Sequence, residues 1–151
     1  MQQITDALKT FDMATVLVVD DYPSCLELLR LLVRDAGHAV LEASDGLTAL
    51  AIARTWKPDV ILLDIDLGFG RPGGLEVARQ LKRDPSTSMI VIVAVSALVM
   101  PEEQQRMFDA GCDAYVSKPF DCVHVQRVLG QALVLAALLR RSETPRAIGH
   151  A

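Results

Sequence analysis

Short apolar runs rich in β-branched residues alternate along this chain with longer segments in which apolar residues recur at helical spacing. Four of these runs are unbroken and bounded by polar residues, and a weaker fifth follows the first. The five runs are TVLVVD (15–20), DVILLD (59–64), MIVIVAVS (89–96), AYVSK (114–118) and the weaker HAVLEA (38–43). Continuous apolar runs of this length are typical of strands buried on both faces, as in a parallel sheet.

Helix-forming segments fill the gaps between the runs. They cover residues 24–36, 45–56, 74–83, 101–110 and 120 to about 141. Pro58 and Pro85 follow two of these segments, Pro101 begins the fourth and Gly111 ends it, as expected at helix boundaries. Strand–helix–strand connections are right-handed, so the helices cover both faces of one sheet. The pattern predicts an α/β fold, a (βα)5 doubly wound parallel sheet of five strands, whose order the pattern alone does not fix.

The alternation indicates one domain without repeat or linker. We expect a lead over residues 1–13, the domain over 14–141 and a flexible tail over 142–151. Hydrophobic residues make up 51% of the 151 and charged residues 23%, which excludes disorder as the default state.

Charge, apolar runs and cysteine content limit the cellular compartments and the kinds of partner to expect. The formal net charge of −4 gives no electrostatic reason to expect nucleic-acid binding. The longest apolar stretch, Met89–Met100, is broken by Ser96, and the first twelve residues lack an apolar signal core. Three cysteines without metal spacing are typical of reduced thiols. We therefore expect a cytoplasmic protein that binds neither nucleic acid nor membrane.

Polar residues end four of the predicted strands. They are Asp20 and Asp21, Asp64 with Asp66 two residues later, Ser96, and Lys118 followed by Pro119. Because ligands of open α/β sheets bind beyond the carboxyl ends of the strands, we expect these side chains to converge. Close carboxylates repel unless a cation lies between them, and Mg²⁺ prefers such oxygen ligands. A lysine and a hydroxyl suit a phosphoryl group, and an aspartate can be its nucleophile. The set predicts Mg²⁺-dependent phosphoryl transfer to a carboxylate.

At this point the chain resembles the receiver domain of response regulators, the phosphorylated partners of histidine kinases in two-component signalling. The resemblance covers about residues 14–140. Its matching segments are VLVVDDYP (16–23), VILLDIDL (60–67), GLEVARQLK (74–82), IVAVSA (92–97) and AGCDAYVSKPF (110–120). The resemblance implies a flavodoxin-like fold with strand order 2-1-3-4-5.

The resemblance also implies roles for the strand-end residues. Asp64 would accept the phosphoryl group. Asp20, Asp21, Asp64 and the backbone carbonyl of Asp66 would bind Mg²⁺, and Lys118 would pair with the phosphoryl oxygens.

The switch residues follow from the same resemblance. Ser96 would hydrogen-bond a phosphoryl oxygen and move toward it, and Tyr115 is the aromatic residue that turns inward in response. The bond between Lys118 and Pro119 would be cis. Phosphorylation would then alter the surface of the fourth helix, fifth strand and fifth helix, around residues 101–110 and 113–126.

The resemblance implies partners rather than an enzyme. Upstream we expect a sensor histidine kinase or a phosphotransfer protein, and downstream a protein target or the next member of a relay. We expect no output domain of its own, and no catalysis beyond its own phosphorylation and dephosphorylation.

Two features depart from the family pattern. Gly68 stands where proline is common, and the glycine-rich loop 68–74 is about two residues longer, which suggests a mobile loop beside the site. Asp66 adds a carboxylate two residues after Asp64, on the same side of an extended chain. We expect this carboxylate to raise metal dependence, which the Mg²⁺ affinity of Asp66→Asn would test.

The last predicted helix contains ALVLAALL (132–139), which is apolar at every position. Apolar residues at every position cover a wider surface than a helix with one buried face needs, and the run is too short to cross a bilayer. Either the core helix overruns its sheet or the segment is an interface; we expect a homodimer through this helix.

Two other functions stay open from the sequence. Asp64-Ile-Asp66 also resembles the nucleophile motif of haloacid-dehalogenase-type phosphatases, although the acidic pair precedes it here. The alternative to both is a receiver-like binding module that works without phosphate.

Overall fold

The computed structural model describes residues 13–68 and 71–148. Most of the expected lead (residues 1–12), two residues of the glycine-rich loop (69–70) and the last three residues of the tail lie outside the described part.

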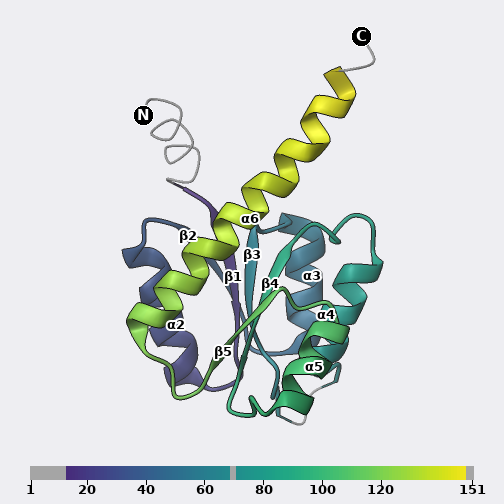
Figure 1. Cartoon of the computed structure of the whole chain (residues 1–151). Helices are drawn as coiled ribbons and strands as arrows, with labels where there is room; N and C mark the ends of the chain where they lie inside the picture. The colour runs from purple at the N-terminus through teal and green to yellow at the C-terminus, as the bar shows by residue number, and fades with distance from the viewer. Residues whose placement is uncertain (1–12, 69–70, 149–151) are drawn as a thin grey trace.

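Five parallel strands form a single sheet in the order β2-β1-β3-β4-β5 (Figure 1). The strands are β1 (Thr15–Val19), β2 (Ala39–Ala43), β3 (Val60–Asp64), β4 (Val91–Ser96) and β5 (Ala114–Ser117). Each lies within one of the predicted apolar runs, so the doubly wound fold and its 2-1-3-4-5 order are confirmed. Every residue of β3 and β4 is buried, as expected for central strands covered on both faces.

Helices cover the two faces of the sheet. They are α2 (Pro23–Asp35), α3 (Gly46–Trp56), α4 (Gly74–Arg83), α5 (Pro101–Asp109) and α6 (Cys122–Ile148). Strand residues alternate between two cores: Val16 and Val18 pack with α2 and α6, whereas Leu17 and Val19 pack with α3, α4 and α5. Figure 1 shows these two helical layers on either side of the sheet.

Strand register aligns the carboxyl ends where the polar residues lie. Val19 pairs with Leu63, so Asp20 and Asp64 occupy corresponding positions at the ends of β1 and β3. Asp64 itself pairs with Val95, and Ser96 pairs with Ser117. The sheet therefore brings four strand ends to one edge.

Helix α6 is longer than the sequence indicated. It continues to Ile148, past the expected end near Arg141 and through Pro145, although a proline inside a helix removes one backbone hydrogen bond. Beyond the sheet it projects past the edge at which the strands begin, away from the edge at which they end (Figure 1).

The apolar residues of α6 include a face packed on the sheet and a long apolar window. Its inner face packs on the sheet through buried residues such as Val125, Leu129 and Ala136. Its window Cys122–Ser142 has a mean hydropathy of 1.6 and is long and apolar enough to cross a membrane, with 33% buried. The sequence expectation of no spanning segment considered the shorter apolar runs 89–100 and 132–139, whereas this window meets the requirement by length and composition alone. A core helix of a soluble domain passes the same test.

Candidate functional site

Three carboxylates meet at the carboxyl edge of the sheet. Asp20 and Asp21 follow β1, Asp64 ends β3, and one oxygen from each lies within 4.8 Å of the others. Asp20 is 0% and Asp64 2% exposed, whereas Asp21 is exposed to solvent. The apolar strands bury two of these charges, and the start of the β1–α2 loop supplies the third at the surface.

Backbone groups fix the orientation of the two buried carboxylates. The Tyr22 N–H donates to Asp20 Oδ1 at 2.8 Å, and the Asp66 N–H donates to Asp64 Oδ1 at 2.9 Å. Each aspartate thus binds the amide two residues later, the local bond that favours Asp at turns. One oxygen of each carboxylate is held by the loop, and the other faces the shared site.

Lys118 reaches the same site from the end of β5. Its Nζ lies 3.1 Å from Asp20 Oδ2 and 3.3 Å from Asp64 Oδ2. The Lys118 N–H donates to the carbonyl oxygen of Ser96 at 2.8 Å, which ties its backbone to β4. The peptide bond between Lys118 and Pro119 is cis.

The net negative charge of the cluster favours a bound cation. Burial raises the pKa of Asp64 to about 6, and the charge of Asp20 adds to the rise, although the Asp66 N–H and Lys118 act against it. Burial lowers the pKa of Lys118, but its hydrogen bond to Asp20 and the charges of Asp64 and Asp20 outweigh burial and leave that pKa raised. The single ammonium does not compensate the carboxylates. Three hard oxygen ligands in a partly buried, anionic site are what Mg²⁺ requires, so the residues present fit this ion.

The predicted switch residues lie on β4 and β5, the two strands that follow β3 in the sheet. Ser96 is 2% exposed, and its Oγ accepts a hydrogen bond from the Leu98 N–H at 3.0 Å. Tyr115 pairs with Ala94 on the neighbouring strand and is half-buried. Its ring meets that of Phe108 on α5 edge to face, with centroids 6.2 Å apart. Contacts therefore link Ala94 of β4 to Tyr115, and Tyr115 to Phe108 of α5.

Residues 16–129 match the family model of the response regulator receiver domain. The chain belongs to this family. Receiver domains are signalling proteins of two-component systems rather than classical enzymes, and they bind Mg²⁺ at their acidic pocket. The phosphatase interpretation is not supported by this membership.

Curated relatives differ in how much of their own length this chain covers. The polar-differentiation response regulator DivK of Brucella anthropi is 38% identical over 105 residues, covering 70% of this chain and 84% of DivK. The DNA-binding dual master transcriptional regulator RpaA of Synechocystis sp. is 34% identical over 139 residues. That match covers 91% of this chain but 54% of RpaA, so this chain spans about half of that regulator.

Solved structures share the receiver architecture. The chemotaxis response regulator CheY4 of Vibrio cholerae is 29% identical with a TM-score of 0.75, covering 80% of this chain and 99% of CheY4. The receiver domain of the sensor histidine kinase PA1611 from Pseudomonas aeruginosa is 25% identical with a TM-score of 0.72, covering 80% and 97%. That structure has a magnesium ion coordinated in its active-site cleft.

Asp66 occupies a different place in this receiver than its spacing suggested. The three-carboxylate group contains Asp20, Asp21 and Asp64, and the Asp66 side chain lies outside it, lining a neighbouring pocket. The chain stops being extended after Asp64, because the Asp66 N–H turns back to the Asp64 carboxylate. Side chains two residues apart share a face only in an extended strand, so the expected contribution of the Asp66 carboxylate to the metal site is not supported.

Glycines of the loop 68–74 allow it to pack closely on the receiver site. Gly68 has φ +59°, and a Cβ there would lie 2.6 Å from Asp21 Oδ2. A Cβ on Gly74 would lie 2.5 Å from the carbonyl oxygen of Asp64. The described ends of this loop are therefore shaped by the site itself, and small residues are required there.

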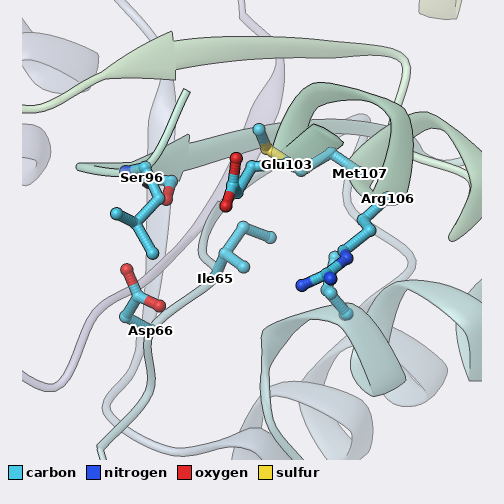
Figure 2. A pocket seen from close by; sticks show the side chains of 8 residues that line it. Ile65, Asp66, Ser96, Glu103, Arg106 and Met107 are labelled. Atoms are coloured by element: carbon cyan, nitrogen blue, oxygen red, sulfur yellow. Dashed lines mark hydrogen bonds between the residues drawn. The ribbon is translucent and has the colours of Figure 1, made fainter. Parts of the chain in front are cut away.

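A pocket beside the three-carboxylate cluster involves residues that the sequence did not single out. It lies between the β3 and β4 ends, α4 and α5, and its polar lining includes Glu103 and Arg106 from α5 (Figure 2). Glu103 is in the first turn of α5, where acidic residues are common for helix-dipole reasons alone. No sequence signal distinguishes this glutamate from Glu102 beside it.

Proposed function

We propose that this receiver domain accepts a phosphoryl group on Asp64, in a Mg²⁺-dependent reaction, from a phosphohistidine of a sensor histidine kinase or phosphotransfer protein. The observation that carries the proposal is the position of Lys118 Nζ, 3.3 Å from Asp64 Oδ2 within the three-carboxylate cluster. A buried nucleophile beside a fixed cation is what a phosphoryl acceptor needs.

Each residue of the cluster has a chemical task in this reaction. An oxygen of Asp64 forms the new bond to phosphorus while the phosphorus–nitrogen bond of the donor breaks, and its electron pair returns to the imidazole. Lys118 stabilises the negative charge of the transferred group. Asp20, Asp21 and Asp64, with the backbone carbonyl of Asp66, would hold Mg²⁺. When bound, this ion neutralises charge on the carboxylates and the phosphoryl oxygens.

The switch follows from the hydrogen bond that Ser96 makes now. Its Oγ is engaged by the Leu98 N–H, so turning toward a phosphoryl oxygen requires it to leave that bond. Tyr115 then moves inward against the space that Ser96 vacates. Because Tyr115 contacts Phe108, the change reaches the surface of α5, β5 and α6, which corresponds to the predicted switch surface.

The partners of this proposal are a kinase or phosphotransfer protein upstream and a protein target or relay member downstream, in the cytoplasm. DivK and CheY4 are response regulators of the same kind, which supports the class of partner. The homodimer expected through the last helix remains a prediction and is tested at the scale of the whole molecule below.

Phosphoramidate, which has the phosphorus–nitrogen bond of phosphohistidine, tests the donor chemistry directly. We expect ³¹P NMR to show Mg²⁺-dependent consumption of phosphoramidate and a protein-bound acyl phosphate. Asp64→Asn should abolish the bound signal, whereas Asp109→Asn, on the exposed end of α5, should not. An unaltered protein without any bound signal would support the module that works without phosphate.

A further inference from the structure

The pocket beside the phosphoryl site has apolar walls and a charged end. Its walls are formed by aliphatic and thioether side chains: Ile65, Leu75, Leu98 and Met107. Its volume is about 120 Å³. Pockets for small-molecule ligands span about 300–1,000 Å³, so this one has room for a single side chain rather than for a whole cofactor.

Glu103 gives this pocket its chemical character. Its Oε2 atom is buried and has no hydrogen-bond partner among the residues that the structure describes, although the side chain as a whole is half-buried. Figure 2 shows the Glu103 carboxylate turned into the space that the lining side chains surround. A buried, unpaired carboxylate oxygen is costly, and a donor entering the pocket would remove that cost.

Charge in the pocket favours a cationic donor. Asp66 and Glu103 are two carboxylates of the lining, and Arg106 is its one cation. Arg106 lies one turn after Glu103 and is exposed to solvent. Among the residues that the structure describes, Arg106 forms no ion pair with Glu103. The lining is therefore net negative and keeps an unsatisfied acceptor.

We infer that this pocket receives one lysine or arginine side chain of a partner protein that docks on α5. The methylene stem would lie against Ile65, Leu98 and Met107, and the cationic head would donate to Glu103 Oε2. Lysine and arginine combine such a stem with a charged tip, and a charge-assisted hydrogen bond is stronger than a neutral one. The inference goes beyond phosphorylation of Asp64, because the pocket is separate from the three-carboxylate group and is present in the unphosphorylated chain.

Ser96 lines the same pocket, which connects the two sites. Movement of its hydroxyl toward a phosphoryl group would alter the pocket wall. Binding of a partner's basic side chain in this pocket would therefore depend on whether Asp64 is phosphorylated, because Ser96 would contribute to both sites.

The experiment uses n-butylguanidinium and n-butylammonium as stand-ins for arginine and lysine side chains, with neutral n-butylurea as the matched control. Amide NMR spectra of the whole chain are recorded with saturating Mg²⁺, which occupies the three-carboxylate cluster. We expect saturable, millimolar binding of the cations with shifts at Leu98, Glu103 and Met107, and at least fivefold weaker binding of butylurea.

Glu103→Gln should weaken cation binding at least fivefold, whereas Glu102→Gln, an exposed neighbour outside the pocket, should leave it unchanged. Neither variant should alter phosphorylation of Asp64, so failure here is distinguishable from failure of the proposed function. Equal binding of cations and butylurea by the unaltered protein would overturn the inference without any variant. So would shifts confined to Asp20 and Asp64, or binding that appears only in Arg106→Gln, because Arg106 would then fill the pocket itself.

Discussion

Asp64 combines two requirements that oppose each other at the scale of a single residue. Its burial at the end of β3 leaves the carboxylate poorly solvated and raises its pKa to about 6. The Asp66 N–H and Lys118 stabilise its charged form. The balance makes the residue dependent on further positive charge, which is the physical basis of its expected need for Mg²⁺.

The first prediction concerns the ionisation of Asp64 in the metal-free protein. A carboxyl whose pKa is raised by folding lowers the free energy of unfolding as pH rises from about 4, its unfolded pKa, to about 6. Asp64→Asn removes that charge, so we expect it to stabilise the metal-free protein by about 1 kcal/mol at pH 8 and by little at pH 4. Urea unfolding at both pH values measures this, and saturating Mg²⁺ should abolish the gain. Equal effects at both pH values without metal would contradict the assignment.

The second prediction concerns Gly74, the first residue of α4. An alanine Cβ there would lie 2.5 Å from the Asp64 carbonyl oxygen and the Ile65 Cα, and neither backbone atom can move without moving the site. We expect Gly74→Ala to lower the free energy of unfolding by about 2 kcal/mol and to slow phosphorylation of Asp64.

Gly130→Ala is the matched control for this substitution. Gly130 lies in α6 with nothing within 4 Å of a Cβ, so alanine there should stabilise the protein by about 0.5–1 kcal/mol. Urea unfolding compares the two variants. Equal stability changes would show that the close packing of Gly74 on the site is unimportant.

Much of the residue-scale site follows from sequence because strand ends are strong positional signals. Asp20, Asp64 and Lys118 end apolar runs, and parallel pairing is sufficient to bring them to one edge. The direction of Asp66 does not follow, since it depends on a turn formed by its own N–H. The buried, unpaired position of Glu103 could not be predicted either, because the pocket around it is formed by elements that are far apart in the sequence.

At the scale of elements, β4, β5 and α5 form the proposed path from the site to the surface. In the proposed switch Ser96 is the first residue of this path, and the rings of Tyr115 and Phe108, with centroids 6.2 Å apart, link it to α5. Of these three side chains, only Phe108 is exposed, so it is the one that a partner can reach.

The third prediction follows from this path. We expect Ser96→Ala to retain at least half of the phosphorylation of the unaltered protein but to lose the phosphorylation-dependent change at α5. Amide NMR shifts of Phe108 and Asp109 before and after phosphorylation measure the loss. Ser86→Ala, in the loop after α4, is a control that should keep the change. A full response at α5 in Ser96→Ala would refute the relay.

Element boundaries are predictable where proline or glycine imposes them. Pro101 begins α5, and Lys57, with φ 45°, ends α3 just before Pro58. The end of α6 does not follow this rule, because the helix continues past Arg141 and through Pro145 to Ile148.

At the scale of the whole molecule, the receiver site and the projecting part of α6 lie at opposite edges of the sheet (Figure 1). Val134 is 48% and Leu138 57% exposed, one turn apart on the outer side of α6. The strand order followed from family resemblance and not from periodicity, since parallel strands with similar apolar runs can be arranged in several orders.

The fourth prediction is the assembly state. Because Val134 and Leu138 are apolar and exposed, we expect light scattering at 100 μM to give twice the chain mass of 16.4 kDa. Leu138→Glu should return the mass to that of one chain, whereas Val123→Glu, exposed at the other end of α6, should not. A single-chain mass for the unaltered protein would remove the dimer and leave α6 as a core helix that overruns its sheet.

The most direct test of the central claim is intact-mass measurement after incubation with acetyl phosphate. We expect a single phosphoryl adduct that requires Mg²⁺, is released by hydroxylamine, and is absent from Asp64→Asn but present in Asp109→Asn. An adduct that persists in Asp64→Asn, or the absence of an adduct from the unaltered protein at every Mg²⁺ concentration, would contradict the assignment of Asp64 as the phosphoryl acceptor.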